Sequence, residues 1–213
     1  MNEDKKKSEV LRRYTELPYL LSLLDKRQLT LLSPNTWDDR NDSKFLRRYK
    51  RLNGLKSILV CCLTEASSTY HHWKVFSSGS SGVCIKFDRI KFVSWAGLNG
   101  LKHGPVIYRS IRKATKKAPK VDEIPYLKRH AFKDEKEYRV ILECQEKEVL
   151  SESIDLDLTT ISEIVINPWL HPSVYPSVEK AIRRFLHDNE SIKIRQTTLL
   201  QNPTWEQIGL QST

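Results

Sequence analysis

The chain has 213 residues, of which 39% are hydrophobic and 29% are charged, a balance typical of one compact globular domain and unlike that of a disordered or collagenous chain. Its formal net charge of +10 favours phosphate-rich partners such as nucleic acid. No apolar run reaches the roughly 20 residues that cross a bilayer, and the N-terminus has no hydrophobic signal segment. We therefore expect a cytoplasmic protein that does not enter a membrane.

The first part of the chain predicts a strand, a helix and a polar loop. Residues 10–14 predict a short strand, and residues 17–25 predict a helix that tolerates Pro18 in its first turn. A hydrophobic run follows at 29–32. Residues 33–43 are rich in Pro, Asn, Asp and Ser, which favour turns and helix caps, so they predict a surface loop.

Two groups of basic side chains recur at helical spacing. The first group is Lys44, Arg47, Arg48 and Arg51, and the second is Arg109, Arg112, Lys113, Lys116, Lys117 and Lys120. Phe45, Tyr49 and Leu52 form an apolar stripe beside the first group, which predicts an amphipathic helix with a cationic outer face. The second group lies on one or more helices predicted within residues 109–128. Both groups are candidate nucleic-acid-binding residues, and the alternative is an ordinary solvated surface.

Two buried strands and an aromatic helix are predicted in the middle of the chain. Continuous apolar runs at 57–64 and 82–87 predict the strands. Between them, Tyr70, Trp73 and Phe76 fall at helical spacing, a pattern typical of a core stripe or of a platform for a ligand. The four cysteines have no spacing typical of zinc ligands, and three of them lie in apolar runs, so we expect neither a metal site nor disulfides.

The remaining elements are predicted as strands at 104–108, 137–143, 161–166 and 192–198 and as a helix within 172–186. Together the elements predict a single α+β domain with a central, mostly antiparallel sheet flanked by helices. We expect this domain to span residues 10–205. A flexible basic N-terminus would precede it at 1–9, and a C-terminal tail would follow it at 206–213.

The stretch HAFKDEKEYRVIL, residues 130–142, places two glutamates two positions apart where a strand is predicted to begin. Alternation along a strand predicts that Glu135 and Glu137 share one face, while the apolar side chains within 138–142 pack on the other. Acids that point away from the core, into a cleft, can serve as catalytic carboxylates. The alternative is an exposed strand whose acids pair with neighbouring lysines or arginines and contribute little energy.

Several segments resemble, by their order, a bacterial family of unknown function. They are LRRYTELPYLLSLLDKRQLTLLSP, WDDRNDS, CCLTEASSTYHHWKVF, SSGVCIKF and HAFKDEKEYRVIL. This succession resembles the bacterial domain-of-unknown-function family number 2971 over about residues 10–166, and more weakly as far as Trp205. The order of the segments carries the resemblance, and the family name implies no chemistry.

The arrangement is also similar, more loosely, to ADP-ribosyltransferases, which have a first strand with Arg or His, a hydroxyl-bearing middle strand and a catalytic glutamate in an ExE triplet. The resemblance implies catalytic roles for Glu137 and Glu135. It implies contacts to the cofactor NAD for Arg12, Arg13, Tyr14, Thr64, Tyr70 and Trp73, with Ser67 or Ser68 as substitutes for Thr64. In this scheme Glu137 stabilises positive charge as the nicotinamide–ribose bond breaks, and Glu135 orients the acceptor. The chain has no clear Ser-Thr-Ser motif after an aromatic strand.

The main functional hypothesis is therefore an NAD-dependent ADP-ribosyltransferase-like enzyme of a bacterial toxin or phage-defence system, acting on nucleic acid or a nucleic-acid-associated target. Its partners would be nucleic acid and a neutralising or sensor protein. One alternative is a non-catalytic module that binds nucleic acid or another protein. A second alternative is a metal-dependent nuclease built on the triplet Asp134-Glu135-Lys136. The sequence leaves the acceptor and the oligomeric state open.

Overall fold

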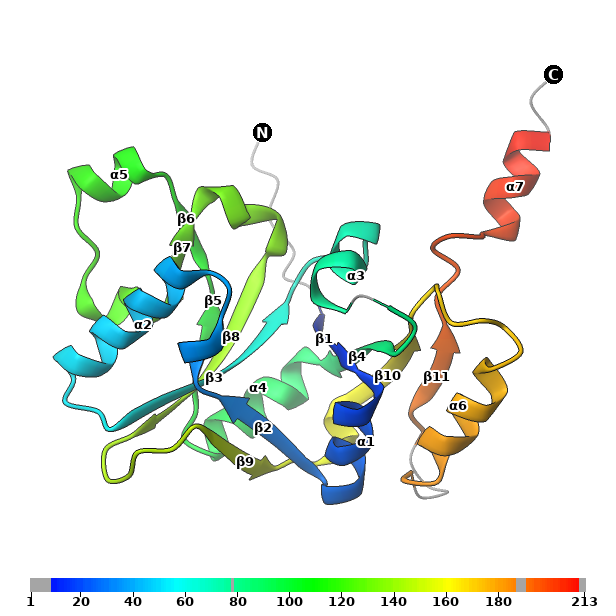
Figure 1. Ribbon diagram of the computed structural model, residues 1–213, viewed down its shortest axis with the longest axis horizontal. Helices are drawn as coiled ribbons and strands as arrows, with labels where there is room; N and C mark the ends of the chain where they lie inside the picture. The colour runs from blue at the N-terminus through cyan, green and yellow to red at the C-terminus, as the bar shows by residue number, and fades with distance from the viewer. Residues whose placement is uncertain (1–8, 78, 187–190, 211–213) are drawn as a thin grey trace.

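The computed structural model describes residues 9–77, 79–186 and 191–210. Its strands are β1 (Val10–Glu16), β2 (Gln28–Leu32), β3 (Ser57–Thr64), β4 (Gly82–Asp88), β5 (Lys102–Pro105), β6 (Ile107–Arg109), β7 (Leu127–Arg129), β8 (Glu137–Cys144), β9 (Ser151–Asp155), β10 (Ile161–Ile166) and β11 (Lys193–Gln196). Its α-helices are α1 (Leu17–Lys26), α2 (Arg40–Leu52), α3 (Tyr70–Phe76), α4 (Arg89–Leu98), α5 (Ile111–Lys116), α6 (Tyr175–Arg183) and α7 (Pro203–Leu210), as Figure 1 shows. Short 3₁₀ helices are η1 (Pro34–Thr36), η2 (Val121–Tyr126), η3 (His130–Glu135) and η4 (Leu158–Thr160).

Nine of the described strands form one central sheet. Their order is β11-β10-β4-β1-β3-β2-β9, with β8 paired to β3 and β5 paired to β8. The pairings are antiparallel except for the parallel pair of β10 and β11. Strands β6 and β7 form a separate parallel ribbon. The predicted α+β domain with a mostly antiparallel sheet flanked by helices is thus confirmed.

The side chains of strand β3 alternate between the two faces of the sheet. Leu59, Cys61 and Leu63 point to the first face and belong to the main hydrophobic core. Ile58 and Val60 point to the second face, where they belong to a smaller core. The main core also contains buried side chains of α1 and α4, so these two helices cover the first face.

The second face carries two helical clusters. Helix α2 and the turn η2 pack on β3 and β8 through Leu46, Tyr49 and Ile124. Helix α3 packs on β1 and β4 through Trp73, which lies in one cluster with Cys84. In Figure 1, strands β3 and β8 run between α2 and α3. Side chains on this stretch of the second face therefore lie between the two clusters.

Helix α2 begins earlier than the sequence predicted. The Asp39 carboxylate caps it and accepts hydrogen bonds from the backbone N–H groups of Asn41 (3.0 Å) and Asp42 (3.3 Å). The loop predicted at 33–43 therefore ends at this cap. Asp42 lies inside the helix with only 3% of its surface exposed, where a solvated loop residue was predicted.

The buried stripe of α2 also differs from the prediction. Leu46 and Tyr49 are buried, whereas Phe45 and Leu52 are 37% and 47% exposed. Burial follows the spacing i, i+4 and i+7 from Asp42, which places the predicted stripe partly on the wrong face of the helix. The cationic outer face is present as expected, with exposed Lys44, Arg47, Arg48 and Arg51.

The region 104–128 departs furthest from the expectation. The strand predicted at 104–108 is two strands, because β5 pairs with β8 while β6 pairs with β7. The second basic group does not form one helical stripe, since α5 ends at Lys116 and Arg109 belongs to β6. Pro119 follows α5 and Pro125 lies in η2, and proline cannot continue an α-helix because it lacks the backbone N–H.

Four strands and α-helices were not predicted, namely β7, β9, α4 and α7. Helix α7 crosses the boundary expected after residue 205, and of the N-terminal segment expected at 1–9 only Glu9 lies within the described residues. In the described part of the chain, no helix is both long enough and apolar enough to cross a membrane.

Candidate active site

Three strands bring an arginine, a threonine and a glutamate into one row. Arg12 of β1 pairs with Thr64 of β3, and Thr64 pairs with Glu137 of β8, in antiparallel register. Residues directly opposite each other in antiparallel strands point to the same face of the sheet. The three side chains therefore lie beside one another on the second face, although they are far apart in the sequence. We call this set the Arg-Thr-Glu row.

A pocket of about 150 Å³ lies at the Arg-Thr-Glu row. Its lining is Arg12, Tyr14, Cys62, Leu63, Thr64, Phe76, Glu135 and Glu137. Five of these residues, all except Cys62, Leu63 and Phe76, are site residues predicted from the sequence. Pockets for drug-sized ligands measure about 300–1,000 Å³, so this pocket fits one ring with its nearest substituents, and a longer ligand has to extend beyond it.

Arg12 brings an unused hydrogen-bond donor to the pocket. Its Nε is buried and has no hydrogen-bond partner among the described residues, and its Nη1 donates only a long bond of 3.4 Å to the Val10 carbonyl. Buried polar atoms in native proteins are nearly always hydrogen-bonded. Arg12 therefore offers the pocket a cation with a free donor, which suits an anionic oxygen of a ligand.

Glu137 is held by two cations. Its Oε1 accepts a hydrogen bond from Arg139 Nε (2.7 Å), and its Oε2 accepts bonds from Arg139 Nη2 (3.0 Å) and Lys128 Nζ (3.1 Å). Its backbone N–H donates to the Tyr108 hydroxyl at 2.8 Å. Cys62 lines the pocket together with Glu137.

Arg139 links Glu137 to helix α2. Its side chain is completely buried, and its guanidinium donates to both oxygens of Asp42 as well as to the Pro125 carbonyl (2.8 Å). Lys128 Nζ lies 3.8 Å from Asp42 Oδ2. The sequence hypothesis placed Glu137 on a polar face away from the core, whereas the structure places it 5% exposed, within a buried charge network, with only one side toward the pocket.

Glu135 does not share the strand of Glu137 as predicted. It ends the 3₁₀ helix η3, and Lys136 then takes a left-handed conformation (φ 41°) before β8 begins. This turn, rather than strand alternation, brings Glu135 beside Glu137, and Lys128 Nζ bonds both carboxylates, at 2.5 Å and 3.1 Å. Thr64 fixes the turn because its hydroxyl donates to the Glu135 carbonyl (2.5 Å).

The two glutamates have opposite pKa shifts. Burial tends to raise the pKa of Glu137, but the charge and hydrogen bonds of Arg139, with Lys128, outweigh it and lower the pKa to about 2. Burial raises the pKa of Glu135 above its ordinary value, and the bond to Lys128 only partly opposes this. Neighbouring carboxylates with separated pKa values can perform different tasks in one reaction.

Arg13, Tyr70 and Trp73 lie outside the pocket. Arg13 follows Arg12 on the strand, so it points to the first face and donates to Cys61 Sγ (3.1 Å). Trp73 is fully buried, with its Nε1 bonded to the Ser68 hydroxyl (2.9 Å). Tyr70 is 44% exposed and is not among the residues that line the pocket.

The aromatic part of the pocket comes from Tyr14 and Phe76. Trp73 meets the Tyr14 ring edge-on with ring centroids 5.0 Å apart, so it supports the pocket from behind. Phe76, which the sequence assigned to an aromatic stripe without a site role, provides the second ring. Arg139, Lys128 and Asp42 were not predicted either. Arg139 was part of the family resemblance, but a single charged residue on a strand gives no sign of its partners.

The basic residues predicted to bind nucleic acid remain mostly exposed, yet they are not one continuous stripe. Arg112, Lys113, Lys116, Lys117 and Lys120 are exposed. Arg109 is half-buried and forms an ion pair with Glu123 (3.2 Å). Nothing in the structure tests nucleic-acid binding by these residues, which stays a prediction.

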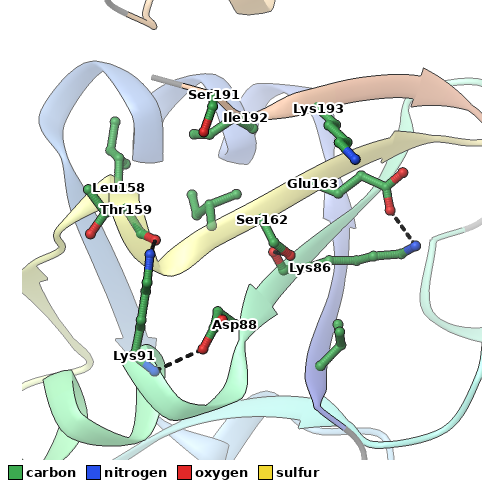
Figure 2. Close-up of a pocket in the computed structure, with 12 residues that line it drawn as sticks. Lys86, Asp88, Lys91, Leu158, Thr159, Ser162, Glu163, Ser191, Ile192 and Lys193 are labelled. Carbon is green, nitrogen blue, oxygen red and sulfur yellow. Dashed lines mark hydrogen bonds and ion pairs between the residues drawn. The ribbon is translucent and has the colours of Figure 1, made fainter. Parts of the chain in front are cut away.

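A larger concavity, of about 580 Å³, lies between β4, β10 and the start of α4 (Figure 2). It contains none of the predicted site residues. Lys86 points to Glu163 in an ion pair of 2.5 Å, and Asp88 caps α4 by accepting from the Lys91 N–H. Two of its polar groups thus already have structural partners, and we place the candidate active site at the Arg-Thr-Glu row.

The nuclease triplet Asp134-Glu135-Lys136 lies at the end of η3. Glu135 is the member that contacts Lys128, and Lys136 is exposed. Among the described residues, no three His, Cys, Asp or Glu side chains lie close enough together to hold a metal ion.

Solved structures of a bacterial protein match most of the chain at low sequence identity. Thermus sp. 2.9 DarT in complex with ADP-ribosylated ssDNA matches with a TM-score of 0.49 and 9% identity, over 92% of this chain and 98% of that chain. The same protein in complex with carba-NAD+ matches with a TM-score of 0.46 and 7% identity, over 90% and 96% of the two chains. At these scores and identities, the assignment of the site rests on the residues of this chain alone.

Among curated proteins, no match is found. A family model does match part of the chain, over residues 72–140, from helix α3 into strand β8. This segment contains Trp73, Lys128, Glu135, Glu137 and Arg139. The matched family is described as "Protein of unknown function (DUF2971)", which confirms the family resemblance predicted from the sequence.

Proposed function

We propose that this chain is an ADP-ribosyltransferase-like enzyme that takes NAD as its substrate. The single observation that carries the proposal is the Arg-Thr-Glu row, which places a cation, a hydroxyl and a carboxylate side by side on adjacent strands. These are the three groups, in the same strand order, that the looser resemblance implies. Because they also line one pocket, they can act on one ligand.

The residues of the pocket fit one end of a dinucleotide. The rings of Tyr14 and Phe76 offer apolar faces to a nicotinamide ring, and the volume of about 150 Å³ admits that ring with its ribose contact. Arg12 holds a free donor on a buried nitrogen, which suits a phosphate oxygen. The remaining part of the dinucleotide would lie outside the pocket.

Glu137 would supply the catalytic charge. Bound NAD supplies an ADP-ribosyl group: its C1′–nitrogen bond breaks, the electron pair leaves with nicotinamide, and C1′ bonds to an acceptor oxygen or nitrogen that gives up its proton. Since the pKa of Glu137 is about 2, the carboxylate is ionised at neutral pH and stabilises positive charge at C1′. It can accept a hydrogen bond from a ribose hydroxyl, because Glu137 lines the pocket.

Glu135 would take the acceptor proton. Burial raises the pKa of Glu135 above its ordinary value, which makes its carboxylate a stronger base. Lys128, bonded to both carboxylates, would keep Glu135 beside Glu137. Thr64 would position Glu135 through the bond to its carbonyl.

The proposed acceptor is nucleic acid or a nucleic-acid-associated target in the bacterial cytoplasm. The exposed cations of α2, namely Lys44, Arg47 and Arg51, support it, because lysine and arginine side chains bind phosphate groups. An enzyme that modifies nucleic acid would be toxic to its own cell, so we place it in a toxin or phage-defence system with a neutralising or sensor protein.

Labelled NAD tests the proposal directly. Wild-type protein, Glu137→Gln and Arg12→Met are incubated with NAD and with RNA, single-stranded DNA or protein acceptors, with and without Mg²⁺. We expect label transfer or nicotinamide release that falls about 10²–10³-fold in Glu137→Gln. Glu163→Gln changes an ion-paired glutamate of β10 away from the pocket, and it should leave label transfer and nicotinamide release unchanged.

Arg12→Met separates a functional loss from a folding defect. Because Arg12 Nε has no hydrogen-bond partner among the residues that the structure describes, the free energy of unfolding should hardly change, whereas NAD binding should weaken. A wild-type protein that neither binds nor consumes NAD would overturn the proposal.

The same experiment examines a second candidate, a non-catalytic nucleic-acid-binding module. The exposed cationic face of α2 favours this candidate, because its side chains can bind phosphate groups without any contribution from the pocket. This candidate is supported if the protein retains RNA or DNA without turnover. Charge reversal at Arg47 should then weaken the retention, and Glu137→Gln should leave it unchanged. Cleavage that requires Mg²⁺ would support the nuclease instead.

A further inference from the structure

A second concavity, the α2–α5 groove, lies between helix α2 and the segment from α5 to β7. Its volume is about 620 Å³. Phe45 and Leu52 line it from α2, and Ile111 and Val121 line it from the other side. All four side chains are substantially exposed, from 37% for Phe45 to 72% for Ile111. Apolar side chains gathered along an exposed groove mark a binding surface more often than scattered ones do.

Helix α2 presents three faces, and only one of them belongs to the groove. Asp42, Leu46 and Tyr49 face the protein core. Phe45, Arg48 and Leu52 follow at the spacing i, i+3 and i+7 and line the groove. The outer face carries Lys44, Arg47 and Arg51, which do not line the groove, and Arg48 lies where the two faces meet. On α2, the groove face therefore shares only Arg48 with the cationic face considered above for nucleic acid.

The groove is cationic as well as apolar. Of the described residues that line it, four are basic, namely Arg48, Arg109, Lys128 and Arg129, and none is acidic. Arg109 pairs with Glu123 and Lys128 pairs with Glu135 and Glu137, so the exposed Arg48 and Arg129 supply the charge that a ligand would meet. A ligand for this groove thus needs an apolar side for the floor and negative charges for the rim.

We infer that the α2–α5 groove binds an acidic amphipathic helix of a partner protein. Amphipathic helices bind in hydrophobic grooves through apolar side chains at i, i+3, i+4 and i+7. The floor favours a helix over single-stranded nucleic acid, because nucleobases stack on aromatic rings and Phe45 is the one aromatic residue among the described lining. The other apolar lining residues are aliphatic, from Leu52 to Leu127.

The groove also reaches the candidate active site through Lys128. Lys128 lines the groove, and its ammonium bonds Glu135 and Glu137. A helix in the groove would therefore contact a residue that holds both glutamates. Binding itself does not depend on the proposed enzymatic function, so the two can fail separately.

A synthetic peptide provides the probe. It is a fluorescein-labelled helix of about 18 residues, roughly five turns, with leucines at i, i+3, i+4 and i+7 and glutamates on the remaining face. Fluorescence anisotropy measures its binding to the full chain. A peptide of the same composition with scattered leucines, a lysine-for-glutamate version and a single-stranded oligothymidylate serve as comparison probes.

Two pairs of variants locate the binding. Ile111→Asp places a charge in the groove, and Ile90→Asp places one on the equally exposed surface of α4. Arg48→Glu reverses a charge in the groove, and Arg47→Glu makes the same change on the outer face of α2. We expect the groove variants to weaken binding about tenfold or more, and their counterparts to change it little.

The outcomes separate the two kinds of ligand. Binding of the patterned acidic peptide alone, lost in Ile111→Asp and retained in Ile90→Asp, supports the inference. Equal binding of the scattered peptide, or an equal effect of both isoleucine variants, overturns it. Oligothymidylate binding that Ile111→Asp abolishes would also overturn it and assign the groove to nucleic acid.

Discussion

Arg139→Met tests whether the buried charge network holds the site together. The guanidinium makes five hydrogen bonds, two to Glu137, two to Asp42 and one to the Pro125 carbonyl. Methionine fills much of the same space but donates nothing. After the change, Lys128 alone faces the two carboxylates, at 3.1 Å from Glu137 and 3.8 Å from Asp42.

The expected loss follows from the burial of the partners. Removing one member of a buried ion pair costs about 3–5 kcal/mol, because the remaining charge stays buried without compensation. For a chain of this size, each kcal/mol lowers the melting temperature by about 2–4 °C, so we expect a drop of about 6–20 °C. Arg195→Met is the matched control. Its ion pair with Glu163 (2.5 Å) is half exposed and should contribute about 1 kcal/mol or less.

The loss should depend on pH in a defined direction. Without Arg139, burial raises the pKa of Glu137 and Asp42 above the unfolded values. A carboxyl group whose pKa is raised in the folded state favours folding below that pKa and opposes it above, so the variant should be less destabilised at pH 5 than at pH 8. Urea unfolding, followed by tryptophan fluorescence at both pH values, measures this. A loss no larger than that of Arg195→Met, or equal losses at both pH values, would refute the reasoning.

Two further predictions concern Glu137 and Gly82, the first residue of β4. Because the folded pKa of Glu137 is about 2, the ionised group stabilises the fold above the unfolded pKa, by about 3 kcal/mol, and this is lost as the pH falls from about 4.5 to 2. Urea unfolding at several pH values should therefore show a flatter profile in this range for Glu137→Gln. Gly82→Ala would place a Cβ 2.3 Å from Ser77 Oγ and 2.6 Å from its carbonyl oxygen, so we expect a loss of about 1–3 kcal/mol by thermal unfolding. Gly97→Ala in α4 should not destabilise the protein, because the added Cβ would have no described atom within 4 Å beyond its chain neighbours and the backbone of its own helix.

Local sequence pattern predicted the elements that bury continuous apolar runs. Strands β3 and β10 were predicted with their observed bounds, because β3 contains a continuous apolar run and β10 is rich in isoleucine and valine and ends before Asn167 and Pro168. Helix α4 was missed, since it follows β4 directly and its sequence RIKFVSWAGL contains β-branched residues and a glycine. Buried Phe92, Trp95 and Ala96 at i, i+3 and i+4 are the signal that could have revealed it.

The site shows why pairing between distant strands limits prediction. Arg12, Thr64 and Glu137 were each candidates, but only the register of β1, β3 and β8 shows that they are neighbours, while Arg13 is not. Asp42 was assigned to a solvated loop because its partner, Arg139, lies 97 residues away. A charge that is buried against a distant partner has the same local sequence pattern as an exposed one.

The charge of Glu137 suits the proposed substrate. Glu137 is ionised, because the charge and hydrogen bonds of Arg139 lower its pKa to about 2, while Arg12 adds a positive charge to the same pocket. In the proposed reaction the nicotinamide ring of NAD is a cation, and the negative charge of Glu137 would attract it. In the proposed reaction, breaking the bond turns nicotinamide neutral and moves the positive charge toward C1′, where the ionised Glu137 would stabilise it more strongly in the transition state than in the bound substrate. Interactions of that kind raise the rate of the chemical step rather than the affinity alone.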